Sequence, residues 1–200
     1  MIPLMDGLNA EFMADPEEFL KKYPVGFKFN SPLGSITEDR VDDFDLSHGS
    51  FGGVELELFA NRGRPGSVYS QKIRAYWLPW LKNETAKLML GNDARFFFTA
   101  ELTGCRIQIG GDANPTVLHI GGYSGSTREW REAQAKEHLG DLYDKSVRYS
   151  KFREDGYSGV AFVCGYWEPA DQRWRILAQQ SKYANRETTV TEVRVLHPKE

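Results

Sequence analysis

Segments in which apolar and polar residues alternate, separated by turn-forming residues, dominate this 200-residue chain and limit the folds open to it. Such alternation is typical of strands with one buried face, and short, dense apolar runs are typical of fully buried strands. Strands are therefore expected at 54–59, 72–81, 95–102, 106–109, 116–120, 159–167, 173–179 and 188–196. Because these segments do not alternate with long helical patterns, the sequence predicts an α+β domain built on a sheet or a sandwich.

Two helix starts stand out among the predicted strands. Asp15 is a good N-cap residue and Pro16 suits the first helical position, so a short helix is expected to run to about Lys22. Residues 126–129 (Ser-Thr-Arg-Glu) form a capping-box pattern, and Gly140 suits the end of the helix that follows. That second helix is mostly polar and is expected on the surface.

The segment 37–53 is acidic and rich in glycine. Its carboxylates are Glu38, Asp39, Asp42, Asp43 and Asp45. We interpret the segment as an irregular, solvated surface loop. A sharper hypothesis is that it forms a patch that meets a basic partner surface.

Composition excludes several classes of function. The net charge is −3 and the sequence pI is about 5.9. This argues against nucleic acid as a direct partner and gives no attraction to an anionic membrane. The two cysteines exclude a disulfide framework, and the four histidines lack metal-site spacing, so neither a metal nor a cofactor is expected. No bilayer-spanning stretch and no secretory signal is visible, and one domain over residues 1–200 is expected.

The most informative segment is the pair of predicted strands at 106–109 and 116–120. Between them, Gly-Gly-Asp-Ala-Asn is a strong turn former, and if it makes the hairpin loop, Ile109 pairs with Pro115. That register places Cys105 directly opposite His119, where facing Cβ atoms are about 4.5–5.5 Å apart. A loop one residue longer would turn the two side chains to different faces.

A cysteine beside a histidine is a pattern of nucleophilic catalysis. A free thiol has a pKa of about 8.5, and an adjacent imidazole can take its proton and make the thiolate available. Gly104 leaves room for a substrate beside Cys105, and backbone groups near the thiol, at Gly104 and Thr103, are the expected oxyanion donors. An active Cys105 would have a lowered pKa and react rapidly with iodoacetamide at mildly acidic pH. The alternative is that Cys105 is a small apolar filler of the core, as we expect for Cys164.

Residues 102–105 (Leu-Thr-Gly-Cys) are similar to the Leu-Ser-Gly-Cys motif of the cytotoxic necrotizing factor deamidase domain and of Burkholderia lethal factor. The likeness to the lethal factor is wider and covers roughly residues 73–131. In order along the chain, it takes in 77–80 (Trp-Leu-Pro-Trp), 97–99 (Phe-Phe-Thr), 102–105, 111–112 (Gly-Asp), 119–120 (His-Ile) and 129–131 (Glu-Trp-Arg).

The resemblance implies a β-sandwich of mixed sheets with flanking helices. It also implies an enzyme that hydrolyses the side-chain amide of a glutamine on a folded protein to glutamate. Cys105 would be the nucleophile, His119 its acid/base partner and Thr99 a threonine beside the active site.

The family's biology adds further expectations. The resemblance implies a toxin and virulence factor that deamidates a translation-initiation RNA helicase of the host and so inhibits translation. Such a protein acts in the host cytosol, and without a visible signal it would be secreted or delivered by another route. A monomer is expected.

Departures from the family's pattern bear on the site. Thr103 stands where serine is usual, and the turn before His119 is slightly longer than in the lethal factor. The C-terminal third gives no match, so Tyr157, Tyr166 and Tyr183 are only candidates for a tyrosine contributed from there.

Three alternatives stay open. If an amine replaced water in the last step, the enzyme would be a transglutaminase. A deamidase of bacterial chemoreceptors would share the chemistry and the fold. A third possibility is a carbohydrate- or protein-binding domain without catalysis, with a stacking surface made of Trp77, Trp80, Tyr123 and Trp130.

Overall fold

The computed structural model describes residues 7–27, 32–49, 52–59, 72–122, 126–151 and 156–198. The α-helices in these ranges are α1 (Leu8–Ala14), α2 (Pro16–Lys22) and α3 (Arg128–Leu139). The strands are β1 (Val25–Phe27), β2 (Arg40–His48), β3 (Val54–Leu58), β4 (Ile73–Leu78), β5 (Thr85–Met89), β6 (Phe96–Thr99), β7 (Arg106–Gly110), β8 (Thr116–Ile120), β9 (Val147–Ser150), β10 (Val160–Glu168), β11 (Arg173–Ala184) and β12 (Glu187–His197). None of the helices in the described ranges is long and apolar enough to cross a membrane.

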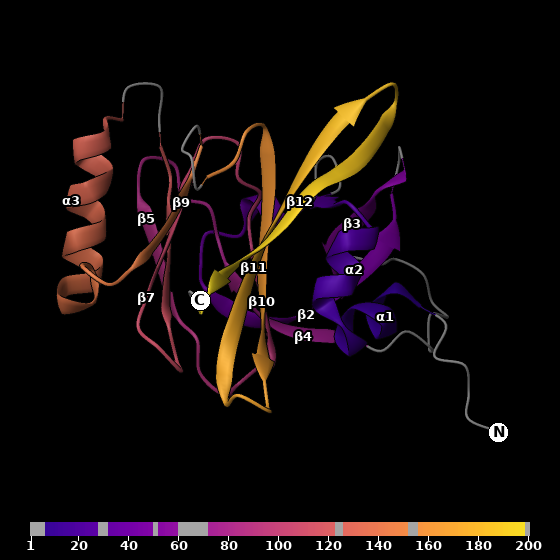
Figure 1. The fold of residues 1–200 in the computed structure, drawn as a ribbon, viewed down its shortest axis with the longest axis horizontal. Coiled ribbons are helices and arrows are strands. Elements are labelled where there is room, and N and C mark those ends of the chain that lie inside the picture. The colour runs from indigo at the N-terminus through magenta and orange to yellow at the C-terminus, as the bar shows by residue number, and fades with distance from the viewer. Residues whose placement is uncertain are drawn as a thin grey trace.

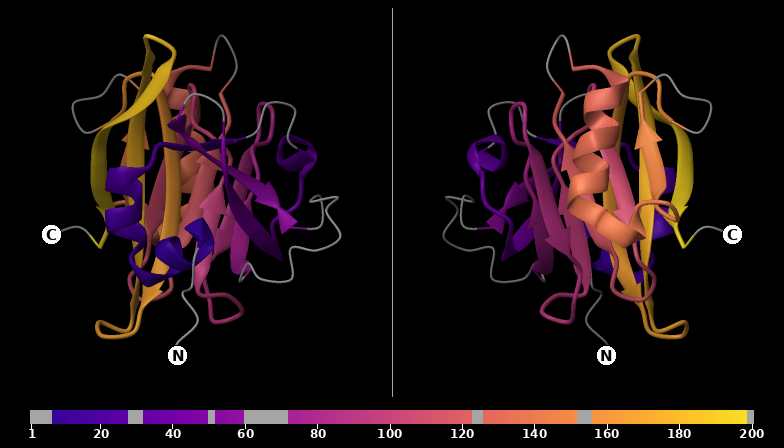
Figure 2. Two further views of the ribbon diagram at one scale, coloured as in Figure 1. Left: turned by 90° about the vertical axis from the view of Figure 1, so that its right-hand side faces the viewer. Right: turned by 90° about the vertical axis from the view of Figure 1, so that its left-hand side faces the viewer.

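The elements form four layers, which follow one another across Figure 1. The helices α1 and α2 cover one face of an eight-stranded sheet, and the other face of that sheet packs against a four-stranded sheet. The helix α3 lies on the outer face of the four-stranded sheet, as the right-hand view of Figure 2 shows. The architecture is therefore α+β, a β-sandwich with flanking helices, as predicted.

The eight-stranded sheet is mixed. Its strand order is β1-β3-β2-β4-β6-β10-β11-β12, with parallel pairing of β1 with β3 and of β4 with β6 and antiparallel pairing elsewhere. Two parallel neighbours need a crossover, and here the crossover runs through β5 in the other sheet. The chain thus passes from sheet to sheet both before and after β6.

The four-stranded sheet is antiparallel, with the order β5-β8-β7-β9. Side chains alternate between its two faces. Ile107, Ile109 and Val117 face the large sheet and share one core with it. Leu118 and Ile120 face α3. Odd-numbered positions of β7 and β8 therefore point between the sheets.

The first predicted helix is confirmed. The Asp15 side chain accepts a hydrogen bond from the Glu18 backbone N–H at 3.0 Å, and α2 ends at Lys22. At the other predicted helix start the cap is one residue later than the capping-box pattern implied. The Thr127 side chain accepts from the Trp130 backbone N–H at 3.1 Å, and α3 begins after Thr127.

The interpretation of residues 37–53 as an irregular loop is wrong. β2 occupies most of the segment and lies inside the large sheet, between β3 and β4. Phe44 and Leu46 are buried in the core beneath α1. Asp45 is only 1% exposed, and its carboxylate accepts a hydrogen bond from Asn9 of α1 at 2.5 Å. A buried carboxylate is tolerated when it is hydrogen bonded, so the acidic composition did not prevent a central strand.

Candidate active site

Cys105 lies at the end of the connection that leads from β6 in the large sheet to β7 in the small sheet. Two contacts fix this connection. Leu102 exchanges two backbone hydrogen bonds with Ala161 of β10, at 2.9 and 3.0 Å. The buried Tyr157 hydroxyl donates to the carbonyl oxygen of Cys105 at 2.9 Å. The backbone of the candidate nucleophile is therefore held in place by the C-terminal third of the chain.

The β7–β8 hairpin has a different register from the predicted one. Gly110 pairs with Thr116, whereas the prediction paired Ile109 with Pro115. Gly111 adopts a φ of 100° at the turn, a conformation that suits glycine. Pro115 has no N–H to donate to the ladder and stays in the loop. The loop is therefore moved one residue along the chain, and every pairing across the hairpin is moved by two.

This register changes the relation between the two predicted catalytic residues. His119 pairs with Ile107, and the same register continued past the start of β7 sets Cys105 opposite Gly121. The prediction that Cys105 lies directly opposite His119 is therefore wrong. Because the shift is an even number of residues, Cys105 and His119 still belong to one face, as diagonal neighbours that point between the sheets.

Thr99 fixes the orientation and the tautomer of His119. The Thr99 hydroxyl donates to the carbonyl oxygen of Leu78 at 2.9 Å, and Thr99 Oγ1 lies 2.9 Å from His119 Nδ1. A hydroxyl has one hydrogen, so Oγ1 must accept a hydrogen bond from Nδ1. The proton of the neutral imidazole is thus on Nδ1, and Nε2 carries a free lone pair. The resemblance implied only that Thr99 lies beside the active site, and the hydrogen bond to Nδ1 makes it a residue that orients His119.

His119 is sealed in the core. Its side chain is fully buried, and burial lowers the pKa of the imidazole to about 3. The imidazole is therefore neutral at physiological pH. Among the described residues Nε2 has no hydrogen-bond partner, so the Cys105 thiol is not hydrogen bonded to it in this state.

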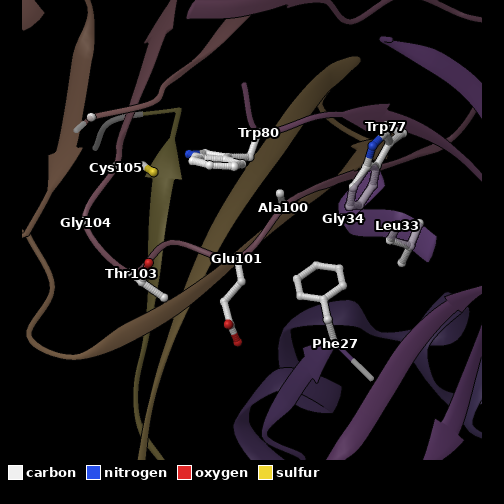
Figure 3. A pocket seen from close by; sticks show the side chains of 11 residues that line it. Phe27, Leu33, Gly34, Trp77, Trp80, Ala100, Glu101, Thr103, Gly104 and Cys105 are labelled. Carbon is white, nitrogen blue, oxygen red and sulfur yellow. The ribbon is translucent and has the colours of Figure 1, made fainter. Parts of the chain in front are cut away.

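The Cys105 thiol opens into a pocket of about 510 Å³. The lining residues are Phe27, Leu33, Gly34, Trp77, Trp80, Ala100, Glu101, Thr103, Gly104, Cys105 and Gly122. They come from β1, the short 3-10 helix Pro32–Ser35, β4 and the residues after it, the β6–β7 connection and the residues after β8, which are far apart in sequence. Figure 3 shows the sulfur of Cys105 near the indole nitrogen of Trp80. A Cβ added at Gly104 would meet no atom within 4 Å, so Gly104 leaves the approach to the thiol open.

Opposing influences act on the Cys105 thiol. Burial is the largest and raises its pKa. Hydrogen bonds from the Gly122 backbone and the Trp80 side chain, the charge of Arg131 and a hydrogen bond from the Gly104 backbone lower the pKa, in that order of size. The same N–H groups would stabilise negative charge that develops beside the sulfur, so they form the candidate oxyanion site.

Two glycines at the end of β8 bring these groups together. A Cβ at Gly121 would lie 2.0 Å from the carbonyl oxygen of Leu81, next to Trp80 in sequence. A Cβ at Gly122 would lie 2.2 Å from Nη2 of Arg131. Gly121 therefore requires glycine, because it approaches backbone atoms, whereas a side chain at Gly122 would displace the end of the Arg131 side chain. The adjacent glycines after the predicted strand were the sequence signal for this part of the site, and sequence reasoning missed it.

The raised pKa of Cys105 is opposite to the lowered pKa expected of an active thiol that iodoacetamide would label rapidly at mildly acidic pH. We expect labelling of the free protein to be slow there and to rise roughly tenfold per pH unit between about pH 6 and pH 8, because only the thiolate reacts. Intact-protein mass spectrometry at several pH values measures this rate. Cys105→Ser should remove the labelling, since Cys164 is fully buried and burial raises its pKa as well. A plateau below about pH 7 would contradict the expected direction of the shift.

Other predicted residues have different places. Cys164 lies in the core, as predicted. Of the candidate tyrosines, Tyr157 reaches the site, whereas Tyr166 packs in the core and Tyr183 is 59% exposed. Thr103 contributes to the rim of the pocket, and its backbone is not among the groups that act on the thiol.

The proposed stacking surface is not a continuous one. Trp77 is fully buried, and Trp130 packs against the apolar cluster beneath α3. Tyr123 lies outside the described residues. Trp80, 39% exposed, remains at the mouth of the pocket. No group of three or more His, Cys, Asp or Glu side chains placed to hold a metal ion occurs in the described ranges.

Comparison with known proteins gives a distant structural likeness. No family model and no curated protein matches the chain. The chain is similar to the C-terminal domain of CNFy from Yersinia pseudotuberculosis, with 11% identity and a TM-score of 0.48, over 94% of this chain and 98% of that one. A likeness at this level does not establish membership of a family.

Proposed function

We propose that this chain is a cysteine-dependent amidohydrolase that converts glutamine side chains of a protein substrate to glutamate. The observation that carries the proposal is the placement of the Cys105 thiol. It faces an open pocket, is flanked by N–H donors from Trp80 and Gly122, and shares one face of a sheet with His119. A structural cysteine needs neither a pocket nor oriented donors.

The acid/base role falls to His119. Thr99 holds the proton on Nδ1, which leaves Nε2 as the acceptor for the thiol proton. In the free protein burial opposes a thiolate–imidazolium pair, because it raises the pKa of Cys105 and lowers that of His119. Proton transfer is therefore coupled to attack on the substrate. It follows a rotation of the Cys105 side chain that brings the thiol within hydrogen-bond distance of Nε2 of His119. Catalytic contacts that are long in a free enzyme commonly tighten in its substrate complex.

The chemistry then proceeds in two halves. Nε2 takes the thiol proton while Sγ forms a bond to the carboxamide carbon, and the oxyanion accepts hydrogen bonds from the donors beside the sulfur. The imidazolium donates its proton to the amide nitrogen, and the carbon–nitrogen bond breaks. Ammonia departs, and the substrate carbonyl remains bound to Sγ as a thioester. Water, deprotonated by the same Nε2, attacks the thioester, and the products are a glutamate side chain and the thiol.

Glutamine is proposed as the substrate because of residues 102–105, whose likeness to the deamidase motif also suggests toxin activity. A translation-initiation RNA helicase of a host cell is the first candidate target. On this proposal the protein acts in the host cytosol, as a monomer, after delivery by an unidentified route, and inhibits translation.

Mass spectrometry of host-cell proteins tests the proposal. We expect extracts treated with the wild-type protein to contain peptides in which one glutamine has become glutamate, and extracts treated with Cys105→Ser to lack them. The purified helicase serves as a separate substrate. If a protein other than the helicase is converted, the helicase is refuted as the target but glutamine deamidation is supported. If the wild-type protein and Cys105→Ser give identical peptide maps, glutamine deamidation itself is refuted.

A further inference from the structure

Glu101 is a carboxylate in an otherwise uncharged pocket. Its side chain points into the pocket between Phe27 and Thr103 (Figure 3), and none of the ten other lining residues is charged. In the part of the chain that the structure describes, this carboxylate has no ion pair and no hydrogen bond. Among the described residues, Lys151 donates to the carbonyl oxygen of the neighbouring Thr103 at 2.7 Å, and no cationic side chain forms an ion pair with Glu101 itself.

Burial makes an unpaired carboxylate unfavourable at this place. It raises the pKa of Glu101 above its ordinary value. The backbone of β1 comes close, since a Cβ added at Gly26 would lie 3.7 Å from Glu101 Oε1. A partly desolvated charge that lacks a partner gains much from a cation that arrives with a ligand.

Aromatic side chains form the walls of the same pocket. Phe27 and Trp77 meet edge to face, with ring centroids 5.9 Å apart. Trp80 stands at the mouth, partly exposed. Aromatic faces attract cations, and apolar walls suit the methylene stem that carries the cationic group of lysine or arginine.

We propose that this pocket binds a lysine or arginine side chain of the protein substrate, with its cationic group on Glu101, close to the glutamine that Cys105 attacks. The inference rests on the proposed function for the identity of the substrate, but the pocket's preference for cations does not. Glu101 is thus a specificity-determining residue, and the substrate class is a protein segment that carries a basic residue beside its target glutamine.

The charges around the site set the direction in which such a segment lies. The positive charge of Arg131 acts on the Cys105 thiol, whereas Glu101 lies apart from the sulfur, between Thr103 and Phe27 (Figure 3). A basic side chain is therefore repelled near the sulfur and attracted toward Glu101. A neutral glutamine amide is free to occupy the end beside Cys105, so the two side chains of the substrate are kept from exchanging places.

Thiol reagents of different charge test the pocket without any deamidation. Aminoethyl methanethiosulfonate is a cation and ethyl methanethiosulfonate is its neutral counterpart. The rates of their reaction with Cys105 are measured by intact-protein mass spectrometry at neutral pH in the wild-type protein, in Glu101→Gln and in Glu187→Gln. Glu187, at the exposed turn between β11 and β12, provides the same change of charge away from the pocket.

We expect the ratio of the cationic to the neutral rate to fall about fivefold or more in Glu101→Gln and to stay unchanged in Glu187→Gln. The ratio cancels any change in the reactivity of the thiol itself. Equal ratios in the two variants would overturn the proposal. Thermal unfolding of Glu101→Gln verifies that the fold is intact.

Glutamine peptides then place the cation on the substrate. Each peptide carries lysine at one position near the glutamine and is compared with a peptide that has norleucine there. For the favoured position we expect the wild-type kcat/KM to be about tenfold higher with lysine, and Glu101→Gln to abolish that preference. A preference that survives in Glu101→Gln would overturn the assignment of the subsite.

The two experiments separate the inference from the proposed function. If the reagent ratio falls in Glu101→Gln but no peptide releases ammonia, the cation pocket stands and the deamidase proposal fails. If ammonia is released with no lysine preference and no change of ratio, the deamidase stands and the subsite fails. A product in which an amine is joined to the glutamine side chain would show that the pocket binds a free amine co-substrate. That result would overturn the proposal that the pocket binds a basic side chain of the protein substrate.

Discussion

Cys105→Ser is expected to lower ammonia release from the substrate by at least about 10³-fold, because a serine hydroxyl beside a buried, weakly basic imidazole is a far poorer nucleophile than a thiol. The substitution is nearly isosteric, so the free energy of unfolding should change by less than about 1.5 kcal/mol. A coupled ammonia assay gives the rate, and chemical denaturation gives the stability.

The second cysteine supplies the matched control. Cys164 is fully buried on the helix-covered side of the large sheet and is not among the residues that line the pocket. Cys164→Ser places a hydroxyl in that core and should reduce stability without changing kcat in the fraction that folds. Undiminished ammonia release by Cys105→Ser, or equal loss in both variants, would refute Cys105 as the nucleophile.

His119→Asn should reduce kcat by about 10²–10⁴-fold, the usual contribution of a general base. The asparagine amide keeps a donor for Thr99 Oγ1, so the buried hydrogen bond survives while the Nε2 lone pair is lost. The variant therefore separates the base from the packing of the imidazole. Activity is measured with the ammonia assay, and retention of the fold is measured by thermal unfolding.

Variants of Thr99 test whether it acts through His119. Thr99→Val removes the acceptor that holds the proton on Nδ1 and should lower kcat by about tenfold, with a loss of stability of about 1–3 kcal/mol. Thr99→Ser restores the hydroxyl and should recover most of kcat. If Thr99→Val and His119→Asn reduced stability alike but left kcat unchanged, the acid/base assignment would be wrong.

The most apolar strands of the fold could be predicted because the composition of each segment by itself indicates that it is buried. β6 and β10 are apolar almost throughout, and β7 and β8 are bounded by glycine, proline and turn residues. Such segments can be stable only inside a packed sheet.

Elements that depend on distant partners could not be recognised in the same way. The helix α1 follows Gly7, an N-cap residue that provides no side-chain hydrogen bond. It is held by packing of Phe12 against Phe96 and Phe98, with ring centroids 5.5 Å apart. β1 has three residues and owes its place to parallel pairing with β3. β2 was missed because its acidic residues suggested a solvated loop, whereas the structure buries the Asp45 carboxylate and gives it a hydrogen bond from Asn9 of α1.

In the candidate site, too, some residues could be predicted from the sequence and others could not. Cys105 and His119 could be proposed from the predicted hairpin, and Thr99 from the resemblance that includes residues 97–99; in the structure Thr99 lies 2.9 Å from His119 Nδ1. Phe27 could not be placed near these residues, since it belongs to β1, an edge strand of the eight-stranded sheet. The direction of the shift in the pKa of Cys105 was also beyond sequence reasoning, because it depends on burial by those distant segments.

The protonated state of the resting sulfur has a consequence for the durability of the protein. Peroxides and other oxidants attack thiolates, and oxidation past the sulfenic acid is not reversed by ordinary reductants. A sulfur that keeps its proton until a substrate arrives is consumed slowly by such oxidants. We therefore expect Cys105 to be oxidised more slowly than a thiol of ordinary pKa.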